Sequence, residues 1–424
     1  MGMKAYPSYR DCVLPWLPAI PSHWEVHRLG AICNKKNRIA RSTDNILICS
    51  NNGTVFPRNE NTLGLISDKE EAYQGVEEGD LLIHGMDTWH GAIAVSKYSG
   101  KCTKVVHVCE SSQNKSFVAY FLQMLAIQNV YKAISNGVRG NTSDFRSWNK
   151  ARIIIIAYPP TIEEQNAIVA YLDKKCAEID ELVTRRQAII ERLKELKQSI
   201  IADAVTKGLN PDVPMMDSGI DWLGEVPQHW EKYRTPSILK VTSKAGTDSD
   251  ELLSVYLDRG VIRHSESDGM QVHKPSKDMS SYQKVLPGNF VCNNQQAWRG
   301  SVGVSEHEGR ISPAYIIFNL SSKLVPKFAN YFFRSQAWNP SFVYSSKGVG
   351  SIQRNLYLPW LRQHYCYLPS TEEQQAIVAY LDKNCAEIDE LVVRQEQIIE
   401  KLKELKTSTI AHVVTGKVDV RDAI

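Results

Sequence analysis

The clearest pattern of apolar and polar positions in this chain is a seam with steps of three and four residues, and it occurs twice. The first seam runs through Ile179, Leu182, Arg186, Ile189, Leu193, Leu196 and Ile200. The second runs through Ile388, Leu391, Gln395, Ile398, Leu402, Leu405 and Thr409. Such spacing keeps apolar side chains on one face of an α-helix and is typical of a coiled coil. Each stretch therefore predicts one long helix.

The two helical stretches are copies of each other. Residues 163–206 and 372–415 are identical at 33 of 44 positions, at a constant offset of 209 and without a gap. A shorter pair precedes them, WLPAIPSHWEV (16–26) and WLGEVPQHWEK (222–232). The chain is thus a tandem duplication of a unit of about half its length. Matching seams separated by a large insert predict that the helices pair with each other, antiparallel.

Local signals mark where the helices begin and end. The segments 161–164 and 370–373 both fit a capping box, in which Thr161 or Ser370 caps a backbone N–H and a glutamate reaches back to the cap. Gly208 and Gly416 follow the copies as stop signals. Arg186 and Gln395 interrupt the seam at the same place. They either fix the register of a pair or simply face solvent or another partner.

The remaining halves share a scaffold but differ in their loops. Segments 79–83 and 89–95 match 288–292 and 298–304, each predicting a strand, a polar loop and a second strand. The run Ile153–Ile156 predicts a buried strand. We expect a mixed α/β (α+β) fold with a pseudo-twofold internal repeat. The predicted division is two globular domains, 1–157 and 210–366, and two helical spacers, 158–209 and 367–424.

Composition narrows the class of protein. A hydrophobic content of 43% with 23% charged residues is ordinary for a soluble globular protein. No apolar stretch is long enough for a membrane span, and the N-terminus lacks the apolar region of a secretory signal. The nine cysteines are scattered without metal-ligand spacing, which favours a reducing cytoplasm. A net charge of +3 means that any nucleic-acid binding must come from local patches.

Catalytic and metal-binding motifs are missing from the sequence. It contains no P-loop, GxGxxG after a strand, HExxH or GxSxG motif. No carboxylate pair recurs in both halves with metal-ligand spacing. We therefore expect a binding protein without catalytic residues and without a metal site.

The candidate binding residues lie in polar loops that differ between the halves. Arg, Asn and Gln can make paired hydrogen bonds to guanine and adenine edges, and two readers of different sequences must differ where they specify. The candidates are Arg139, Asn141 and Arg146 in the first half, and Gln295, Arg299, Gln353 and Arg354 in the second, with Lys347 expected on a phosphate. Alternatively, these side chains merely close loops or meet water. Trp89 and Trp298, at matched positions, are expected to pack the base of their loops.

Two variable domains alternating with two near-identical helices, each opening with proline and EEQ, resemble the specificity subunit of type I restriction–modification enzymes. The resemblance covers essentially the whole chain. It implies that each globular domain reads one half of a bipartite site in double-stranded DNA. It also implies that the helices form an antiparallel coiled coil that spaces the halves and docks two modification (methyltransferase) subunits, with restriction (translocase/endonuclease) subunits completing the complex.

The same resemblance implies that this chain carries no catalytic residues and binds no cofactor itself. S-adenosylmethionine, ATP and Mg would belong to the partner subunits. A different reading of the duplication remains open: a structural adaptor with a coiled-coil spine and two protein-binding domains would show the same pattern.

Overall fold

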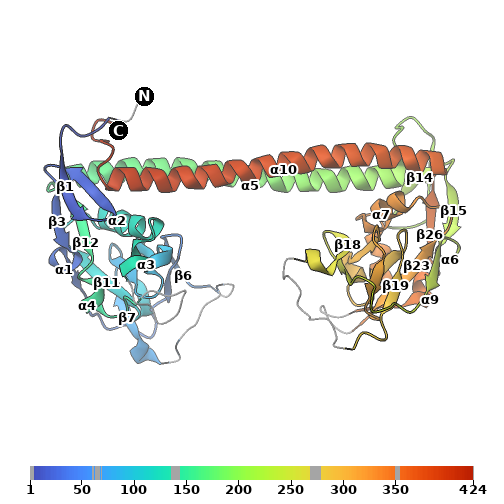
Figure 1. Ribbon diagram of the computed structural model, residues 1–424, viewed down its shortest axis with the longest axis horizontal. Helices are drawn as coiled ribbons and strands as arrows, with labels where there is room; N and C mark the ends of the chain where they lie inside the picture. Colours follow the sequence, from blue (N-terminus) through green and yellow to red (C-terminus); the bar gives the residue numbers. More distant parts are fainter. Residues whose placement is uncertain are drawn as a thin grey trace. The chain divides into compact units, whose positions relative to one another are not determined.

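The structure, a computed structural model, describes residues 4–59, 62, 67, 69–134, 144–267, 278–348 and 354–423. It divides into two compact units, which are described separately. Unit 1 is Met1–Gln187 with Glu396–Ile424, and unit 2 is Ala188–Gln395. Each unit therefore combines one globular part with one half of each long helix (Figure 1). The predicted mixed α/β class with two long helices is confirmed.

Unit 1 opens with short strands and ends its globular part at the long helix α5 (Ile162–Lys207). Its strands are β1 (Tyr9–Leu14), β2 (Leu17–Pro21), β3 (Glu25–Arg28), β4 (Cys33–Lys35), β5 (Leu47–Cys49), β6 (Val55–Pro57), β7 (Tyr73–Val76), β8 (Leu81–His84), β9 (Ile93–Val95), β10 (Gly100–Thr103), β11 (Val106–Ser111) and β12 (Ile155–Tyr158). Its short helices are α1 (Leu29–Ile32), η1 (Glu70–Ala72), η2 (Thr88–His90), α2 (Lys115–Ile127), α3 (Val130–Ile134) and α4 (Trp148–Ala151).

Unit 2 repeats this order and ends its globular part at the long helix α10 (Thr371–Val414). Its strands are β13 (Met215–Asp217), β14 (Glu225–Pro227), β15 (Glu231–Arg234), β16 (Leu239–Thr242), β17 (Leu253–Tyr256), β18 (Gly260–Arg263), β19 (Gln283–Val285), β20 (Phe290–Asn293), β21 (Val302–Val304), β22 (Gly309–Ile311), β23 (Tyr315–Leu320), β24 (Ser346–Lys347), β25 (Asn355–Leu356) and β26 (Tyr365–Leu368). Its short helices are α6 (Thr235–Ile238), η3 (His264–Glu266), η4 (Ala297–Arg299), α7 (Pro326–Arg334), α8 (Asn339–Tyr344) and α9 (Leu358–Leu361).

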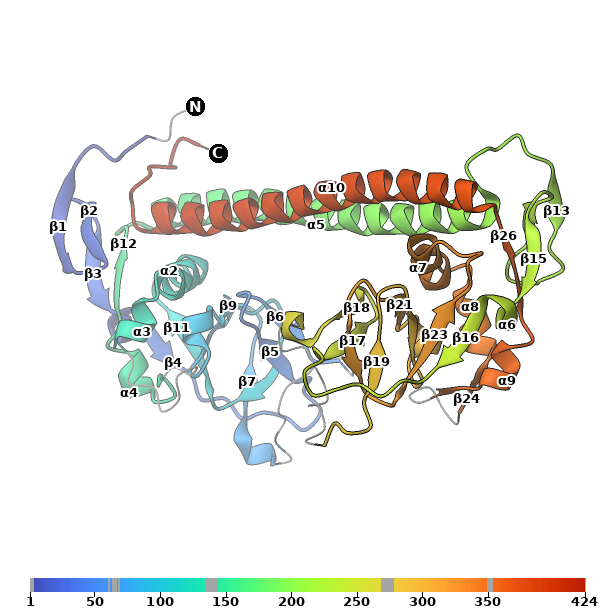
Figure 2. The same ribbon diagram turned by 45° about the vertical axis from the view of Figure 1, so that its right-hand side comes forward.

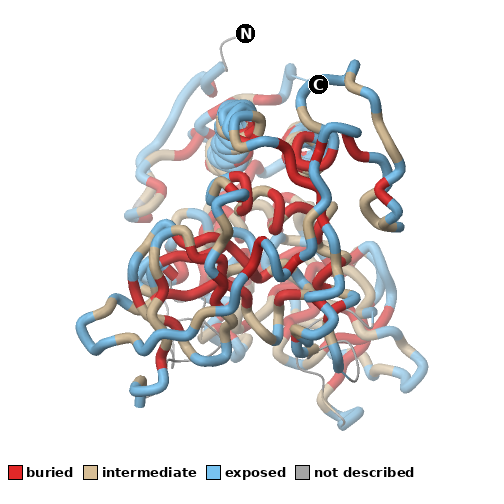
Figure 3. Tube along the Cα trace, turned by 90° about the vertical axis from the view of Figure 1, so that its right-hand side faces the viewer, coloured by how far each residue is buried: buried red, intermediate tan, exposed pale blue. Residues whose placement is uncertain are grey.

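A four-stranded antiparallel sheet forms the centre of each globular part. Its order is β4-β11-β8-β9 in unit 1 and β16-β23-β20-β21 in unit 2, so both predicted strand–loop–strand segments are confirmed as hairpins. Neighbouring side chains of a strand point to opposite faces. In β8, Leu81 and Ile83 join the core that includes α2, whereas Leu82 joins a second apolar cluster with β5 and β10. Burial of both faces explains the unbroken apolar run of β8. Buried positions gather inside the globular parts, whereas their outer loops are largely exposed (Figure 3).

The predicted buried strand at 153–156 begins later than expected. β12 covers Ile155–Tyr158 and pairs with β3. Ile156 is fully buried, but Ile153 is 57% exposed because it lies in the turn between α4 and β12.

The helices α2 and α7 lie between the sheet and the long helices of their own units (Figures 1 and 2). In unit 1 the hydroxyl of Tyr120 on α2 donates to Asp173 on α5 at 2.7 Å. In unit 2 the hydroxyl of Tyr331 on α7 donates to Asp382 on α10 at 2.9 Å. The same joint therefore fixes each globular part to its helix.

The glutamine of each EEQ sequence makes a second joint. Gln165 and Gln374 are both fully buried. The side-chain oxygen of Gln165 accepts from the backbone N–H of Asn114, just before α2, and that of Gln374 accepts from Val325, just before α7, both at 2.8 Å. Each glutamine thus satisfies a backbone donor at a helix start, which helps to explain why EEQ occurs in both copies.

Within each unit the halves of α5 and α10 pair antiparallel, as predicted. In unit 1, Ile168 and Leu172 near the start of α5 share a core with Ile410 and Val413 near the end of α10. Further along α5 and earlier along α10, Lys406 pairs with Asp180 at 2.7 Å. Unit 2 has the matching pair Lys197–Asp389, also at 2.7 Å.

Half of the predicted seam is wrong by one residue. The seam runs instead through positions that are all buried or half-buried: Cys176, Ile179, Val183, Arg186, Ile190, Leu193, Lys197 and Ile200 on α5, and Cys385, Ile388, Val392, Gln395, Ile399, Leu402, Lys406 and Thr409 on α10. The predicted Leu182, Ile189, Leu196, Leu391 and Leu405 are 41%, 37%, 49%, 42% and 52% exposed, and Ile398 is half-buried.

The error has a simple cause in the sequence. Most of the misplaced residues are followed directly by a second apolar residue, such as Val183 after Leu182 and Ile190 after Ile189, so either phase satisfies the three–four spacing. Lys197 and Lys406 hide the correct phase, because the long stem of a lysine can lie in an apolar seam while its ammonium group reaches out. Arg186 and Gln395 do belong to the seam.

The predicted capping boxes are half correct. The backbone N–H of Glu164 donates to the Thr161 hydroxyl at 3.4 Å, and that of Glu373 donates to the Ser370 hydroxyl at 3.2 Å. The glutamates, however, point away from the caps. The Glu164 carboxylate accepts from the Trp24 indole at 3.0 Å, and Glu373 accepts from the Trp230 indole at 3.2 Å.

The glutamates therefore bind the HW sequence of the segment at 16–26 or 222–232. His23 lies 2.9 Å from Glu164, and His229 lies 2.9 Å from Glu373. The stop signals are confirmed: Gly208 follows α5 directly, Gly416 lies two residues after the end of α10, and both adopt a left-handed φ, of 75° and 72°.

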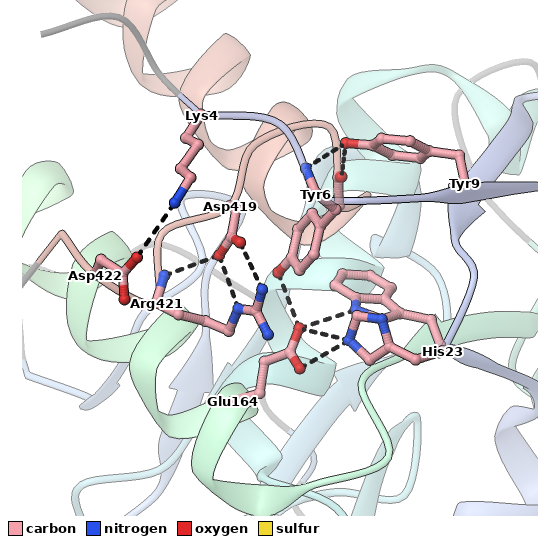
Figure 4. Close-up of polar contacts among 10 residues, drawn as sticks. Lys4, Tyr6, Tyr9, His23, Glu164, Asp419, Arg421 and Asp422 are labelled. Carbon is pink, nitrogen blue, oxygen red and sulfur yellow. Dashed lines mark hydrogen bonds and ion pairs between the residues drawn. The ribbon is translucent and has the colours of Figure 1, made fainter.

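In unit 1 the two ends of the chain close over Glu164 (Figure 4). Lys4 and Asp419 form an antiparallel bridge, and the Asp419 N–H donates to the Lys4 carbonyl at 2.8 Å. The hydroxyl of Tyr6 donates to Glu164 at 2.9 Å, and the guanidinium of Arg421 lies 5.1 Å from the Tyr6 ring centre. Burial and the Glu164 carboxylate raise the pKa of Tyr6 well above its usual value, so this hydroxyl stays a donor.

Candidate nucleic-acid interface

The loop between β20 and β21 presents two of the candidate residues in unit 2. The Asn293 side chain accepts from the Gln295 N–H at 3.0 Å, and the Trp298 indole donates to the Gln295 carbonyl at 3.1 Å. These bonds close the loop and leave the side chains of Gln295 and Arg299 exposed. Trp298 thus does pack its own loop, as expected.

A short hairpin brings two further candidates to this loop. β24 and β25 pair, with Lys347 opposite Asn355. The N–H of Leu356 then donates to the Asn294 carbonyl at 2.9 Å, which fixes the hairpin against the loop. As a result, the side chains of Arg354 and Arg299 both lie over the Trp298 indole.

Three of the candidate cations lie over aromatic rings. The guanidinium carbons of Arg299 and Arg354 lie 4.9 Å and 5.1 Å from the centre of the Trp298 ring. The Lys347 ammonium lies 4.4 Å from the Tyr357 ring centre and 5.0 Å from that of Trp360. Gln353 lies outside the described residues. The structure therefore gathers Gln295, Arg299, Lys347 and Arg354 around one loop and one hairpin.

Unit 1 has a related but different arrangement. The Phe145 N–H donates to the Gly85 carbonyl at 3.0 Å, so the chain before α4 meets the loop between β8 and β9. A Cβ at Gly85 would lie 2.8 Å from the Cα of Arg146, so this approach requires glycine. Arg146 is exposed beside that loop, whereas Arg139 and Asn141 lie outside the described residues.

Two histidines, one of them fully buried and the other half-buried, support this loop of unit 1. His107 is fully buried, and its Nε2 lies 2.6 Å from the Phe145 carbonyl. Burial lowers the pKa of His107, and burial also lowers the pKa of His84 at the start of the loop. Nε2 of a neutral His107 therefore donates to the Phe145 carbonyl. This bond fixes the chain before α4 against the loop between β8 and β9.

Sequence reasoning missed Lys132, Tyr357 and Trp360. The Lys132 ammonium lies 5.1 Å from the Trp89 ring centre in unit 1. Tyr357 and Trp360 stand in an edge-to-face pair, with ring centres 5.3 Å apart. A signal was present, because Tyr357 and Trp360 follow Arg354 closely in the sequence YLPW, and aromatic residues near cations are common on nucleic-acid-binding surfaces.

The nearly neutral net charge hides an uneven distribution. Residues 1–160 contain 18 Lys and Arg against 13 Asp and Glu, and residues 208–369 contain 17 against 14. The two helical segments, 161–207 and 370–424, together contain 15 against 20. Both globular parts are thus basic, and the acidic balance belongs to the helices. Basic local surfaces suit a phosphate backbone.

Two features that would point to another class of protein are a membrane-spanning helix and a metal-binding cluster. No described helix is both long and apolar enough to cross a membrane. The described part of the chain also holds no group of three or more His, Cys, Asp or Glu side chains that could bind a metal ion.

No family model matches the chain. Among curated proteins it is 23% identical, over 331 residues, to the type I restriction enzyme EcoBI specificity subunit of Escherichia coli, covering 74% of this chain and 67% of that protein. It is 21% identical, over 315 residues, to the EcoKI specificity subunit of Escherichia coli strain K12, covering 71% of this chain and 65% of that protein. The chain thus spans about two thirds of the length of each.

Solved structures give the same fold. A chain from a study of complex assembly and conformational transition of the type I R-M system matches with a TM-score of 0.68 and 16% identity, covering 94% of this chain and 99% of that one. The HsdS subunit from Thermoanaerobacter tengcongensis matches with a TM-score of 0.51 and 17% identity, covering 94% and 98%. In sequence the chain is similar to two type I restriction enzyme specificity subunits, and it shares its fold with the HsdS subunit.

Proposed function

We propose that this chain is the DNA-recognition subunit of a type I restriction–modification complex, in which each globular part reads one half of a bipartite site. The observation that carries the proposal is the repeated scaffold with unlike loops. In unit 2, Arg299, Arg354 and Lys347 surround the β20–β21 loop, whereas unit 1 presents Arg146 and Lys132 around the matched β8–β9 loop. Two domains with the same scaffold but different cationic side chains in their loops suit the recognition of two different DNA sequences.

The apolar residues that lie beside the seam would supply a docking surface for a partner. Leu182, Ile189 and Leu196 on α5, and Leu391, Ile398 and Leu405 on α10, form rows that border the seam. A helix with an apolar face this wide is typical of a bundle of more than two helices. We propose that helices of two modification subunits cover these rows, one subunit for each copy, and that restriction subunits complete the complex.

The chemistry of such a complex would lie in the partners. S-adenosylmethionine would be bound by the modification subunits, and ATP and Mg by the restriction subunits. This chain would contribute no catalytic group, and its tasks would be to select DNA and to hold the partners.

The test is co-expression with the modification subunit encoded by the same genome. The proposal expects the two proteins to co-purify and the complex to methylate DNA at one divided motif, with no methylation when this chain is omitted. A structural adaptor without DNA recognition would instead co-purify with partners but leave the methylated sequences unchanged when it is omitted. That result would reject the proposed function.

A further inference from the structure

The cations of the unit 2 interface are held by aromatic rings rather than by carboxylates. Among the residues that the structure describes, no Asp or Glu forms an ion pair with Arg299, Lys347 or Arg354. Other cations of this unit are neutralised: Lys284 pairs with Asp250, and Lys327 pairs with Asp382 at 2.7 Å. A cation on a ring face keeps its full charge, so these three side chains remain available to an anionic ligand.

The rings that hold them are not part of the apolar core. Tyr357 and Trp360 are 39% and 37% exposed, and Trp298 is half-buried. The core aromatics of unit 2, such as Trp338 and Phe342, are almost completely buried. In α9, Leu361 supplies the buried contact, so Trp360 is not needed to anchor that helix.

Unit 1 lacks this arrangement at the matched positions. When α4 is aligned with α9, Ser147 takes the place of Tyr357, and Lys150 takes the place of Trp360. Lys150 pairs with Asp144. His90 stands where unit 2 has Arg299, and Trp89 carries the single cation Lys132 among the described residues. Among the described residues, the two units therefore differ in how many candidate cations lie over aromatic rings.

We propose that Trp298, Tyr357 and Trp360 are positioning residues for DNA binding by unit 2. Trp360 and Tyr357 hold Lys347 toward a phosphate, and Trp298 holds Arg299 and Arg354 toward a base edge. Holding a long side chain in place reduces the entropy lost on binding. Because Ser147 and Lys150 stand at the matched positions of unit 1, the positioning by Tyr357 and Trp360 is a feature of unit 2. The inference rests on the proposed function.

The experiment uses the complex with its modification subunits and duplexes that carry the methylated motif. Trp360→Leu should weaken binding to all duplexes alike by about two- to fivefold, the size of one exposed cation–ring contact. It should also reduce the slope of log affinity against log salt by up to about 0.9, the value for one phosphate contact. Trp360→Phe keeps a ring and should restore most of the affinity.

Two comparisons separate positioning from folding. In a background that lacks both rings, Tyr357→Leu with Trp360→Leu, Lys347→Ala should weaken binding less than it does in the wild type, because the lysine has already lost its support; full additivity of the losses would overturn the proposal. Trp298→Leu should relax discrimination at a base pair of the unit 2 half-site and leave the other half-site unchanged. Unchanged affinity and ranking in both leucine variants would also overturn it. If the wild-type complex shows no sequence preference, the proposed function fails instead.

Discussion

At the scale of single residues, Glu164 and Glu373 connect each long helix to the HW segment near the start of the globular part of the same unit. The two sites are alike but not equal. The Glu164 side chain is 7% exposed and accepts from Trp24, His23 and Tyr6, whereas that of Glu373 is 28% exposed and accepts from Trp230 and His229. The extra donor in unit 1 comes from the closing of the chain ends.

We therefore predict that Glu164→Ala destabilises unit 1 more than Glu373→Ala destabilises unit 2. Each buried donor left without an acceptor costs about 1–3 kcal/mol, and Glu164 leaves more of them. Urea unfolding of both variants, followed by tryptophan fluorescence, measures the difference. Equal losses, or a larger loss for Glu373→Ala, would show that the closed ends add nothing to this site.

A second residue-scale prediction concerns pH. The pKa of His107 is lowered by burial in the folded state, and its value in the unfolded chain is about 6.5. The unfolded chain therefore binds the extra proton first, so stability is complete above about pH 6.5 and falls as the pH drops below it. Burial also lowers the pKa of His84, which therefore acts in the same direction.

The measurement is the denaturation midpoint of wild type and His107→Gln between pH 7.5 and pH 5. Glutamine can still donate to the Phe145 carbonyl but does not titrate. We expect the variant to lose less stability than wild type over this range, with other titrating groups accounting for the remainder, among them His84 and His364, whose pKa values burial also lowers. Parallel curves would contradict the role given to His107.

At the scale of elements, the helical seam shows what the sequence could and could not predict. The helices, their ends and their antiparallel pairing follow from spacing, caps and duplication. The phase did not follow, because Ile189 and Ile190 are both apolar and satisfy the same spacing. In the structure they are 37% and 6% exposed.

These neighbours provide a matched pair of variants. Ile190→Ala should destabilise by about 2–5 kcal/mol because it removes a buried side chain. Ile189→Ala should change stability by less than about 0.5 kcal/mol, as at other exposed positions. If the proposed docking surface is correct, Ile189→Asp should abolish co-purification with the modification subunit, whereas Ala188→Asp, an exposed neighbour, should not.

Thermal unfolding followed by helical circular dichroism checks the first two expectations, and affinity co-purification checks the third. Equal destabilisation by the two alanine variants would contradict the placement of Ile190, rather than Ile189, in the seam. Normal co-purification of Ile189→Asp would remove this row from the docking surface.

At the scale of the whole molecule, the duplication makes the organisation predictable and leaves the binding residues open. Matched islands around residues 79–95 and 288–304 predict the central hairpins of both sheets. Contacts between residues far apart in the sequence were harder to predict. Trp24 and Glu164, for example, are separated by most of the sequence of unit 1. The only sequence signal for their contact was that HW and EEQ occur together in both copies. The roles of Arg139, Asn141 and Gln353 remain predictions from residue type alone.

The central claim is that two separate readers share one scaffold. The most direct test replaces residues 226–366 with the equivalent segment of another specificity subunit and maps methylated bases across the genome of cells that co-express the modification subunit. This segment contains β15 and the first two residues of its partner strand β26, so the central sheet of unit 2 moves as one piece. We predict a motif in which one half changes and the other stays the same. A change in both halves, or in neither, would contradict it.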